Sequence, residues 1–164
     1  MTASRAILLA GFLAGTLDIL YAFARLFGRS PEWVLQSVAS GLQGAAAFAG
    51  GAASAALGLV AHYTIATGAA AVYFLASRRI GLLTSHAVIA GAIFGALVYL
   101  FMNFVVIPLS AFPYALSYPP LTVLEGFASH AVFVGIPVAL SIRAAGRSPA
   151  ARGGSVHASA SPQL

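Results

Sequence analysis

Residues 85–107 read SHAVIAGAIFGALVYLFMNFVVI and contain no Asp, Glu, Lys or Arg. An α-helix rises about 1.5 Å per residue, so about 20 apolar residues cross the roughly 30 Å hydrocarbon core of a bilayer. Three other stretches have the same character, and each must be helical because lipid offers no partner for a free backbone N–H or C=O group. The predicted membrane spans are residues 6–24, 54–76, 85–107 and 121–142.

The composition of the whole chain supports this prediction. Of the 164 residues, 60% are apolar and only 7% are charged, whereas a soluble domain usually carries about 25% charged residues. So little charge excludes an ordinary soluble domain, a disordered chain and a coiled coil. The chain has no cysteine, which excludes disulfides, thiolate metal sites and cysteine nucleophiles. The predicted fold class is all-α, a polytopic integral membrane helical bundle with residues 1–143 as its transmembrane domain.

The segment 31–51 between the first two spans allows two interpretations. Ser30 is suited to cap a helix, with Pro31 at its first position and Glu32 in its first turn. We favour a short interfacial or re-entrant helix over about 31–41, followed by a Gly/Ala-rich link, because the segment is polar for a lipid-facing helix. The alternative is a fifth span.

The basic residues are all arginines, and they lie singly or in pairs between apolar segments. This distribution is typical of topology determinants and does not indicate nucleic-acid binding. The four-span model puts Arg25 and Arg29 outside, whereas the five-span model puts only Arg5 outside, which suits the positive-inside rule slightly better. In the four-span model the inside arginines are Arg5, Arg78, Arg79, Arg143, Arg147 and Arg152.

Both models place the C-terminus inside. We therefore expect a multi-pass protein of the bacterial inner (plasma) membrane with a cytoplasmic C-terminus. Residues 144–164 are rich in Ser, Ala, Gly and Arg, which predicts a flexible cytoplasmic tail.

Few polar side chains interrupt the spans, and those that do fall in the same half of the bilayer. From the helical rise, they lie between about 6 and 14 Å below the outer edge of the hydrocarbon core. Titratable groups at such depth are costly and usually face the bundle interior or a wet cavity. The sequence therefore predicts an intramembrane polar cluster that opens outward above an apolar floor: Asp18, His62, Asn103, Glu125 and His130.

Carboxylate–imidazole pairs within this cluster would suit a proton relay or a pH sensor. The alternative is that the same groups satisfy one another as interhelical hydrogen bonds and hold the bundle together. Two histidines with two carboxylates can also bind a divalent metal, but five residues separate Glu125 from His130 and rotate them about 140° apart on a helix. The chain has no phosphate-binding loop, HExxH motif or nucleophile elbow. We expect no catalytic residues, no metal and no cofactor, and hence no enzyme.

Glycines at four-residue spacing form two faces that allow close helix packing. Gly11 and Gly15 lie in the first span, and Gly91 and Gly95 lie in the third. Such faces let helix backbones approach in lipid, either within one subunit or between copies. Asp18 shares the first face, so it should point into the bundle. Glycine also precedes His62 and His130 by four residues, which indicates room for a neighbouring helix beside each histidine.

The second half of the chain resembles a known family. Ala90-Gly91-x-x-x-Gly95, then Pro108-Leu109, Glu125, His130 and a closing Arg143 are similar to the YagU-like bacterial inner-membrane proteins. His62 with the apolar run to Tyr73 is similar to the preceding span of that family. The resemblance covers about the last 90 residues before the tail, and the first loop is shorter here. It implies an inner-membrane location and four spans, and it implies no catalytic residue.

Two functions are therefore expected. The first is a small inner-membrane protein that handles or senses protons or a small solute through the polar cluster. The second is a structural or partner-binding membrane subunit that assembles through the glycine faces. The expected partners are the lipid bilayer and either a second copy of the chain or another membrane protein, without nucleic acid.

Overall fold

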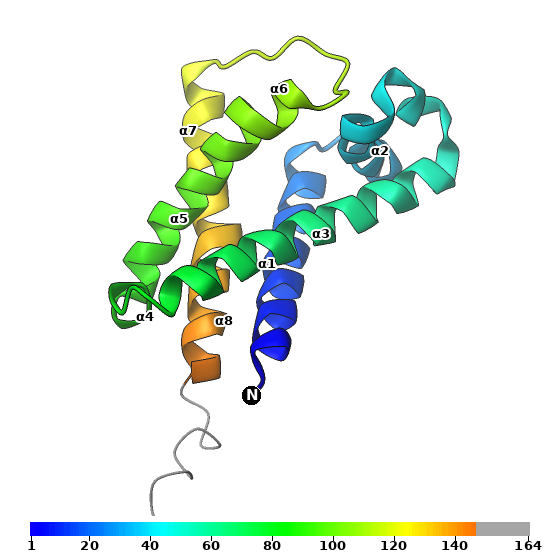
Figure 1. The fold of residues 1–164 in the computed structure, drawn as a ribbon. Coiled ribbons are helices and arrows are strands. Elements are labelled where there is room, and N and C mark those ends of the chain that lie inside the picture. The colour runs from blue at the N-terminus through cyan, green and yellow to red at the C-terminus, as the bar shows by residue number, and fades with distance from the viewer. Residues whose placement is uncertain (147–164) are drawn as a thin grey trace, which may run out of the picture.

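Four long helical rods make up most of the part of the chain that the structure describes (Figure 1). The computed structural model describes residues 1–146, and within them no strand occurs. The rods are Ala3–Arg25, Gly51–Ser77, Ala87–Leu109 and Pro120–Gly146, each long and apolar enough to cross a membrane. The all-α fold with four transmembrane helices is thus confirmed. The tail predicted for 144–164 lies almost wholly outside the described residues.

The first two rods, α1 (Ala3–Arg25) and α3 (Gly51–Ser77), are regular α-helices. Each of the other two contains a π-helical segment between α-helical parts. A short α4 (Leu82–Ser85) lies between the second and third rods. The third rod is α5 (Ala87–Phe101), η2 (Met102–Val106) and α6 (Ile107–Leu109). The fourth rod is α7 (Pro120–Ser129), η3 (His130–Gly135) and α8 (Ile136–Gly146).

The ambiguous segment forms a short helix, α2 (Pro31–Gln43), and then a 3-10 turn, η1 (Gly44–Ala49). The Ser30 hydroxyl caps α2 by accepting the Trp33 N–H at 3.1 Å, and Pro31 occupies the first turn as predicted. With 13 residues, α2 is too short to cross a bilayer core. The structure therefore has four spans rather than five.

Helix α2 packs closely across α3, and Gly58 makes this contact possible. A Cβ at Gly58 would collide with the backbone carbonyl of Leu35 and lie 3.2 Å from the Ala39 nitrogen. The Gln36 side chain donates a hydrogen bond to the Gly51 carbonyl at 3.2 Å, which fixes α2 beside the start of α3. The prediction that this glycine makes room for a neighbouring helix is confirmed.

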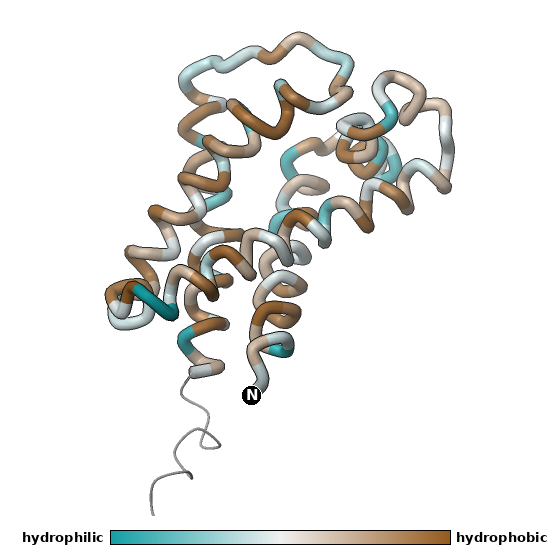
Figure 2. The backbone as a smooth tube through the Cα atoms, in the orientation of Figure 1, coloured by the Kyte–Doolittle hydropathy of each residue, from teal (hydrophilic) through white to brown (hydrophobic). Residues whose placement is uncertain are grey.

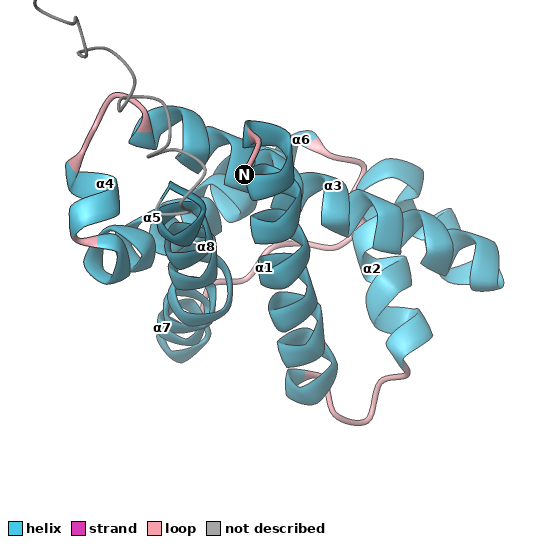
Figure 3. Cartoon of the chain, turned by 90° about the horizontal axis from the view of Figure 1, so that it is seen from below, coloured by secondary structure: helices cyan, strands magenta, loops and turns pink. Residues whose placement is uncertain are grey.

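The rods form an open row instead of a closed ring. Helix α1 contacts α3 on one side and η3 with α8 on the other, and α5 packs on η3 and α8 (Figure 3). The helices α3 and α5 both approach α4, and from there they diverge toward the opposite end of the molecule (Figure 1). This divergence leaves space between α3 and α5 on one side of the row.

Each π-helical segment precedes a proline within its rod. Pro108 follows η2 and Pro137 follows η3. Proline has no N–H to donate, and its ring clashes with the carbonyl four residues earlier, so it kinks or breaks a regular α-helix. A π turn is rare, occurs mostly as a single widened turn inside an α-helix, and is frequent at functional sites.

The packed core lies at the end of the molecule near α4. Its centre is Tyr73, which is 1% exposed, stacks edge-on against Phe94 and donates a hydrogen bond to the Leu83 carbonyl at 2.8 Å. Large apolar side chains such as Phe12 and Leu97 face outward on the rods, and apolar residues are spread along all four (Figure 2). An apolar surface of this extent suits lipid and not water.

Candidate functional site

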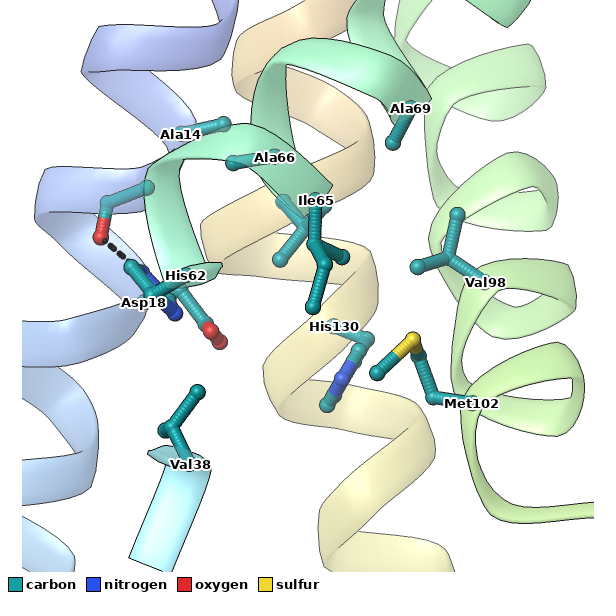
Figure 4. A pocket seen from close by; sticks show the side chains of 12 residues that line it. Ala14, Asp18, Val38, His62, Ile65, Ala66, Ala69, Val98, Met102 and His130 are labelled. Carbon is teal, nitrogen blue, oxygen red and sulfur yellow. Dashed lines mark hydrogen bonds between the residues drawn. The ribbon is translucent and has the colours of Figure 1, made fainter. Parts of the chain in front are cut away.

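A cavity of about 210 Å³ lies where α1, α3, η3 and the end of α5 meet. We call it the central cavity. Asp18 from α1, His62 from α3 and His130 from η3 line it and project toward the same space (Figure 4). The remaining lining is mostly apolar and includes Ile65 and Met102. Three of the five predicted polar residues therefore meet here.

A second cavity of about 380 Å³ adjoins the first, and we call it the end cavity. Asn103 and Glu125 line it, together with Tyr118 from the segment between α6 and α7. Asp18 and His130 line both cavities. The structure thus arranges all five predicted residues around two neighbouring cavities, and two of these residues line both cavities.

Both histidines use one ring nitrogen to bind a backbone carbonyl. His62 Nε2 lies 2.8 Å from the Gly15 carbonyl oxygen, and His130 Nδ1 lies 3.0 Å from the Gly126 carbonyl oxygen. A carbonyl only accepts, so each of these nitrogens carries the proton. In the neutral imidazoles, His62 Nδ1 and His130 Nε2 are then acceptors.

Asp18 is half-buried and stands on the glycine face of α1. Among residues 1–146, no side chain or backbone N–H donates a hydrogen bond to its carboxylate in this structure. A carboxylate at this depth is costly without a partner. The Asp18 carboxylate is therefore available to accept hydrogen bonds from a ligand or water in the central cavity.

Glu125 is paired with Arg25 and not with a histidine. Glu125 Oε1 accepts from Arg25 Nε and from the Tyr21 hydroxyl at 2.8 Å. The side chains of Arg25 and Glu125 are 50% and 35% exposed, so this ion pair lies at the rim of the end cavity and joins α1 to α7. Glu125 pairs with Arg25 because this charged donor is within reach. Among the described residues, neither Glu125 nor Asp18 forms the expected carboxylate–imidazole pair.

The side chain of Asn103 finds its hydrogen-bond partner within its own rod. Its side-chain amide donates to the Tyr99 carbonyl at 3.0 Å, and its backbone carbonyl accepts from the Tyr118 hydroxyl at 2.9 Å. The aromatic ring of Tyr118 also stacks on Phe104. Asn103 therefore helps to fasten the loop above the end cavity while its side chain lines that cavity.

The four predicted packing glycines all face helices of the same chain. A Cβ at Gly11 would lie 2.6 Å from Thr67 Cα, and one at Gly91 would lie 2.8 Å from the Gly135 carbonyl oxygen. Gly15 faces the side chain of Tyr63, whereas Gly95 faces the backbone of η3. These positions are therefore occupied in packing a single subunit.

Sequence reasoning missed several residues that shape the site. Tyr21 and Arg25 hold Glu125, although Arg25 was interpreted only as a topology signal. The π turns that begin at Met102 and His130 place both residues in the lining of the central cavity. The available signal in the sequence is a proline directly after the third predicted span, at 108, and a proline within the fourth, at 137.

Within residues 1–146, no group of three or more His, Asp or Glu side chains is placed to hold a metal ion. No family model, curated protein or solved structure matches the chain, so the YagU-like resemblance stays a prediction.

Proposed function

We propose that this protein handles protons or a small solute within the membrane, through the central cavity and the end cavity. The observation that carries the proposal is that Asp18 and His130 line both spaces. A continuous series of titratable groups inside a membrane bundle is the usual basis of proton relays and solute sites. The apolar core around Tyr73 lies at the opposite end and would act as a barrier beneath the cavities.

The arginines support an orientation for this path. Arg5, Arg78 and Arg143 lie at the end of the rods near α4, whereas Arg25 and Arg29 lie at the other end (Figure 1). The positive-inside rule then places the α4 end on the cytoplasmic side. On this basis the end cavity would face outward and the C-terminus would lie in the cytoplasm, and the YagU-like resemblance implies that the membrane is a bacterial inner membrane.

Proton movement can be measured in lipid vesicles that contain the purified protein and a trapped pH-sensitive dye. An imposed pH gradient should decay faster with wild-type protein than in protein-free vesicles. Asp18→Asn should abolish the difference, because it removes the titratable carboxylate at nearly constant volume. His130→Ala should also abolish the difference, because it removes a titratable group that lines both cavities.

Glu32→Gln is the matched control. Glu32 is exposed on α2 and accepts a hydrogen bond from Gln36 within the same helix, and it lines neither cavity. Its neutralisation should leave the decay of the gradient unchanged. Wild-type vesicles that match protein-free vesicles across about pH 5 to 8, the range in which imidazole titrates, would refute proton handling.

The alternative function, a subunit that assembles through the glycine faces, has less support. Gly11, Gly15, Gly91 and Gly95 all face helices of their own chain, so an assembly surface would need other residues. Analytical ultracentrifugation in detergent tests the alternative directly.

A further inference from the structure

An apolar groove lies between the diverging helices α3 and α5, beside the central cavity. Its volume is about 530 Å³, and we call it the lateral groove. Every lining residue is apolar: Ile65, Gly68, Ala69, Val72, Phe94, Leu97, Val98, Phe101, Met102 and Val106. Since both walls belong to membrane-spanning helices, this groove is a place for hydrocarbon.

The lateral groove adjoins the central cavity. Ile65, Ala69, Val98 and Met102 line both spaces, and Met102 is drawn next to His130 in the close view (Figure 4). A molecule in the groove would therefore reach the polar cavity by passing these four side chains. Met102 is flexible and can move aside.

The length of the groove corresponds to about one leaflet. From Phe94 to Val106 the helix rises about 18 Å at ~1.5 Å per residue. The hydrocarbon core of a bilayer is roughly 30 Å thick, so a single leaflet is roughly 15 Å thick. On the α3 wall the lining runs only from Ile65 to Val72, about 10 Å on the same rise. One alkyl chain would therefore be covered by both walls over about 10 Å and by the α5 wall over nearly the depth of a leaflet.

The central cavity offers hydrogen-bond acceptors to a molecule that enters it. The proton positions fixed by the Gly15 and Gly126 carbonyls leave His62 Nδ1 and His130 Nε2 as acceptors in the neutral rings. The Asp18 carboxylate adds two more acceptor oxygens and a negative charge. No Lys or Arg lines the central cavity. This chemistry favours a headgroup that donates hydrogen bonds and carries positive charge.

We propose that the lateral groove and the central cavity together bind a membrane amphiphile with an alkyl chain and a primary ammonium headgroup. The chain lies between α3 and α5, and the ammonium lies against Asp18. An ammonium has three donors and no acceptor, which matches the acceptors of the cavity. This inference rests on the proposed role of the central cavity as the functional site, and it names the class of ligand.

Photo-labelling tests the proposal on the full chain in detergent micelles. The probe is tetradecylamine with a diazirine in the middle of its chain, and the comparison probe is tetradecanoic acid with the same diazirine. Mass spectrometry of peptides locates the label. The amine should label α3 and α5 in the segments that line the groove, and the acid should label them much less, because Asp18 repels a carboxylate.

Two variants separate the headgroup contact from the chain contact. Asp18→Asn should weaken amine labelling about tenfold, since a charge-assisted hydrogen bond is lost. Gly68→Leu should block the groove, and the fold has space for it because an added Cβ meets no atom within 4 Å. The controls are Glu32→Gln and Gly81→Leu, which also has open space but lies outside the groove; circular dichroism checks folding.

Equal labelling by amine and acid, or an unchanged result with Asp18→Asn, would overturn the ammonium assignment. Unchanged labelling with Gly68→Leu would overturn the groove, and label spread evenly over outward-facing residues would show that only bulk lipid is in contact. The assay measures binding without any flux. Proton movement without selective amine labelling would therefore defeat this inference alone, whereas selective labelling without movement would defeat proton handling alone.

Discussion

The same sequence pattern, Ala-Gly-x-x-x-Gly, makes two different helix contacts in this molecule. In α1 it reads Ala10 to Gly15, and in α5 it reads Ala90 to Gly95. Gly15 faces an aromatic side chain on α3, whereas Gly95 faces the backbone of η3 directly. The difference is confined to Gly15, because a Cβ at Gly11 on the same face of α1 would lie 2.6 Å from Thr67 Cα. It comes from the residue opposite each glycine: an aromatic ring lies beside Gly15, whereas a backbone lies beside Gly11 and Gly95.

The residues that lie opposite Gly95 and Gly15 on the neighbouring helices explain this difference. A Cβ at Gly135 of η3 would lie 2.5 Å from the Gly95 nitrogen, so glycine on both sides brings the two backbones together. At the other contact Tyr63 stacks with Phe12, and the neighbouring His62 binds the Gly15 carbonyl. A small-residue pattern therefore predicts a packing face, but the residues of the partner decide how close the helices come and whether polar groups fit beside them.

The largest effect is expected for Gly95→Ala. The added Cβ would overlap the backbone at His130 and Ala131, and a backbone cannot move aside as a side chain can. Overpacking of this kind costs about 1–3 kcal/mol, so the unfolding free energy measured by denaturant titration in detergent should fall by that amount. Gly15→Ala should cost less, since the Tyr63 ring, 3.0 Å from the added Cβ, can rotate away.

Gly68→Ala is the control for both substitutions, because its Cβ has open space and alanine is the better helix former. It should not lower the unfolding free energy. Equal losses for Gly95→Ala and Gly15→Ala would contradict the distinction between a backbone contact and a side-chain contact.

The spans and the short helix could be predicted because both depend on local signals. Hydropathy over residues 85–107 is sufficient to identify a span, and a serine before a proline is sufficient to start α2. The depths of Asp18 and His130 follow from helical rise alone, so their presence in shared cavities is consistent with simple counting along each span.

The pairing of charged side chains and the arrangement of the helices could not be predicted in this way. Arg25 and Glu125 are 100 residues apart in sequence, and nothing local shows that an arginine would replace a histidine as the partner of this carboxylate. The divergence of α3 from α5 depends on how every helix in the row packs. The lateral groove therefore follows only from the three-dimensional arrangement.

A smaller loss of stability is expected when Glu125, which links α7 to α1, is replaced. Glu125→Ala removes both the ion pair with Arg25 and the acceptor of the Tyr21 hydroxyl, whereas Glu125→Gln keeps an oxygen for Tyr21. The thermal midpoint in detergent should fall more for Ala than for Gln. The decrease for Gln should be small and should shrink with added salt, because exposed ion pairs are screened.

A double substitution of Arg25→Gln with Glu125→Gln gives the pair interaction separately from the single losses. If Gln and Ala at position 125 lower the midpoint equally, the Tyr21 hydroxyl contributes nothing to the link between the two halves.

The smallest loss of stability is expected for Tyr63→Phe, which tests the side-chain contact at Gly15. The Tyr63 hydroxyl lies 2.9 Å from the Thr16 hydroxyl on α1, and the substitution removes this hydrogen bond while the ring beside Gly15 stays. Interhelical hydrogen bonds in membrane proteins contribute about 0.6 kcal/mol on average, so the unfolding free energy should fall by about that amount. Thr16→Val should give a similar loss, and combining the two should add little, since both remove one bond. A loss above about 2 kcal/mol, beyond the largest values for such bonds, would mean that the hydroxyl, and not the packing of the ring, dominates the contribution of Tyr63 to the contact between α1 and α3.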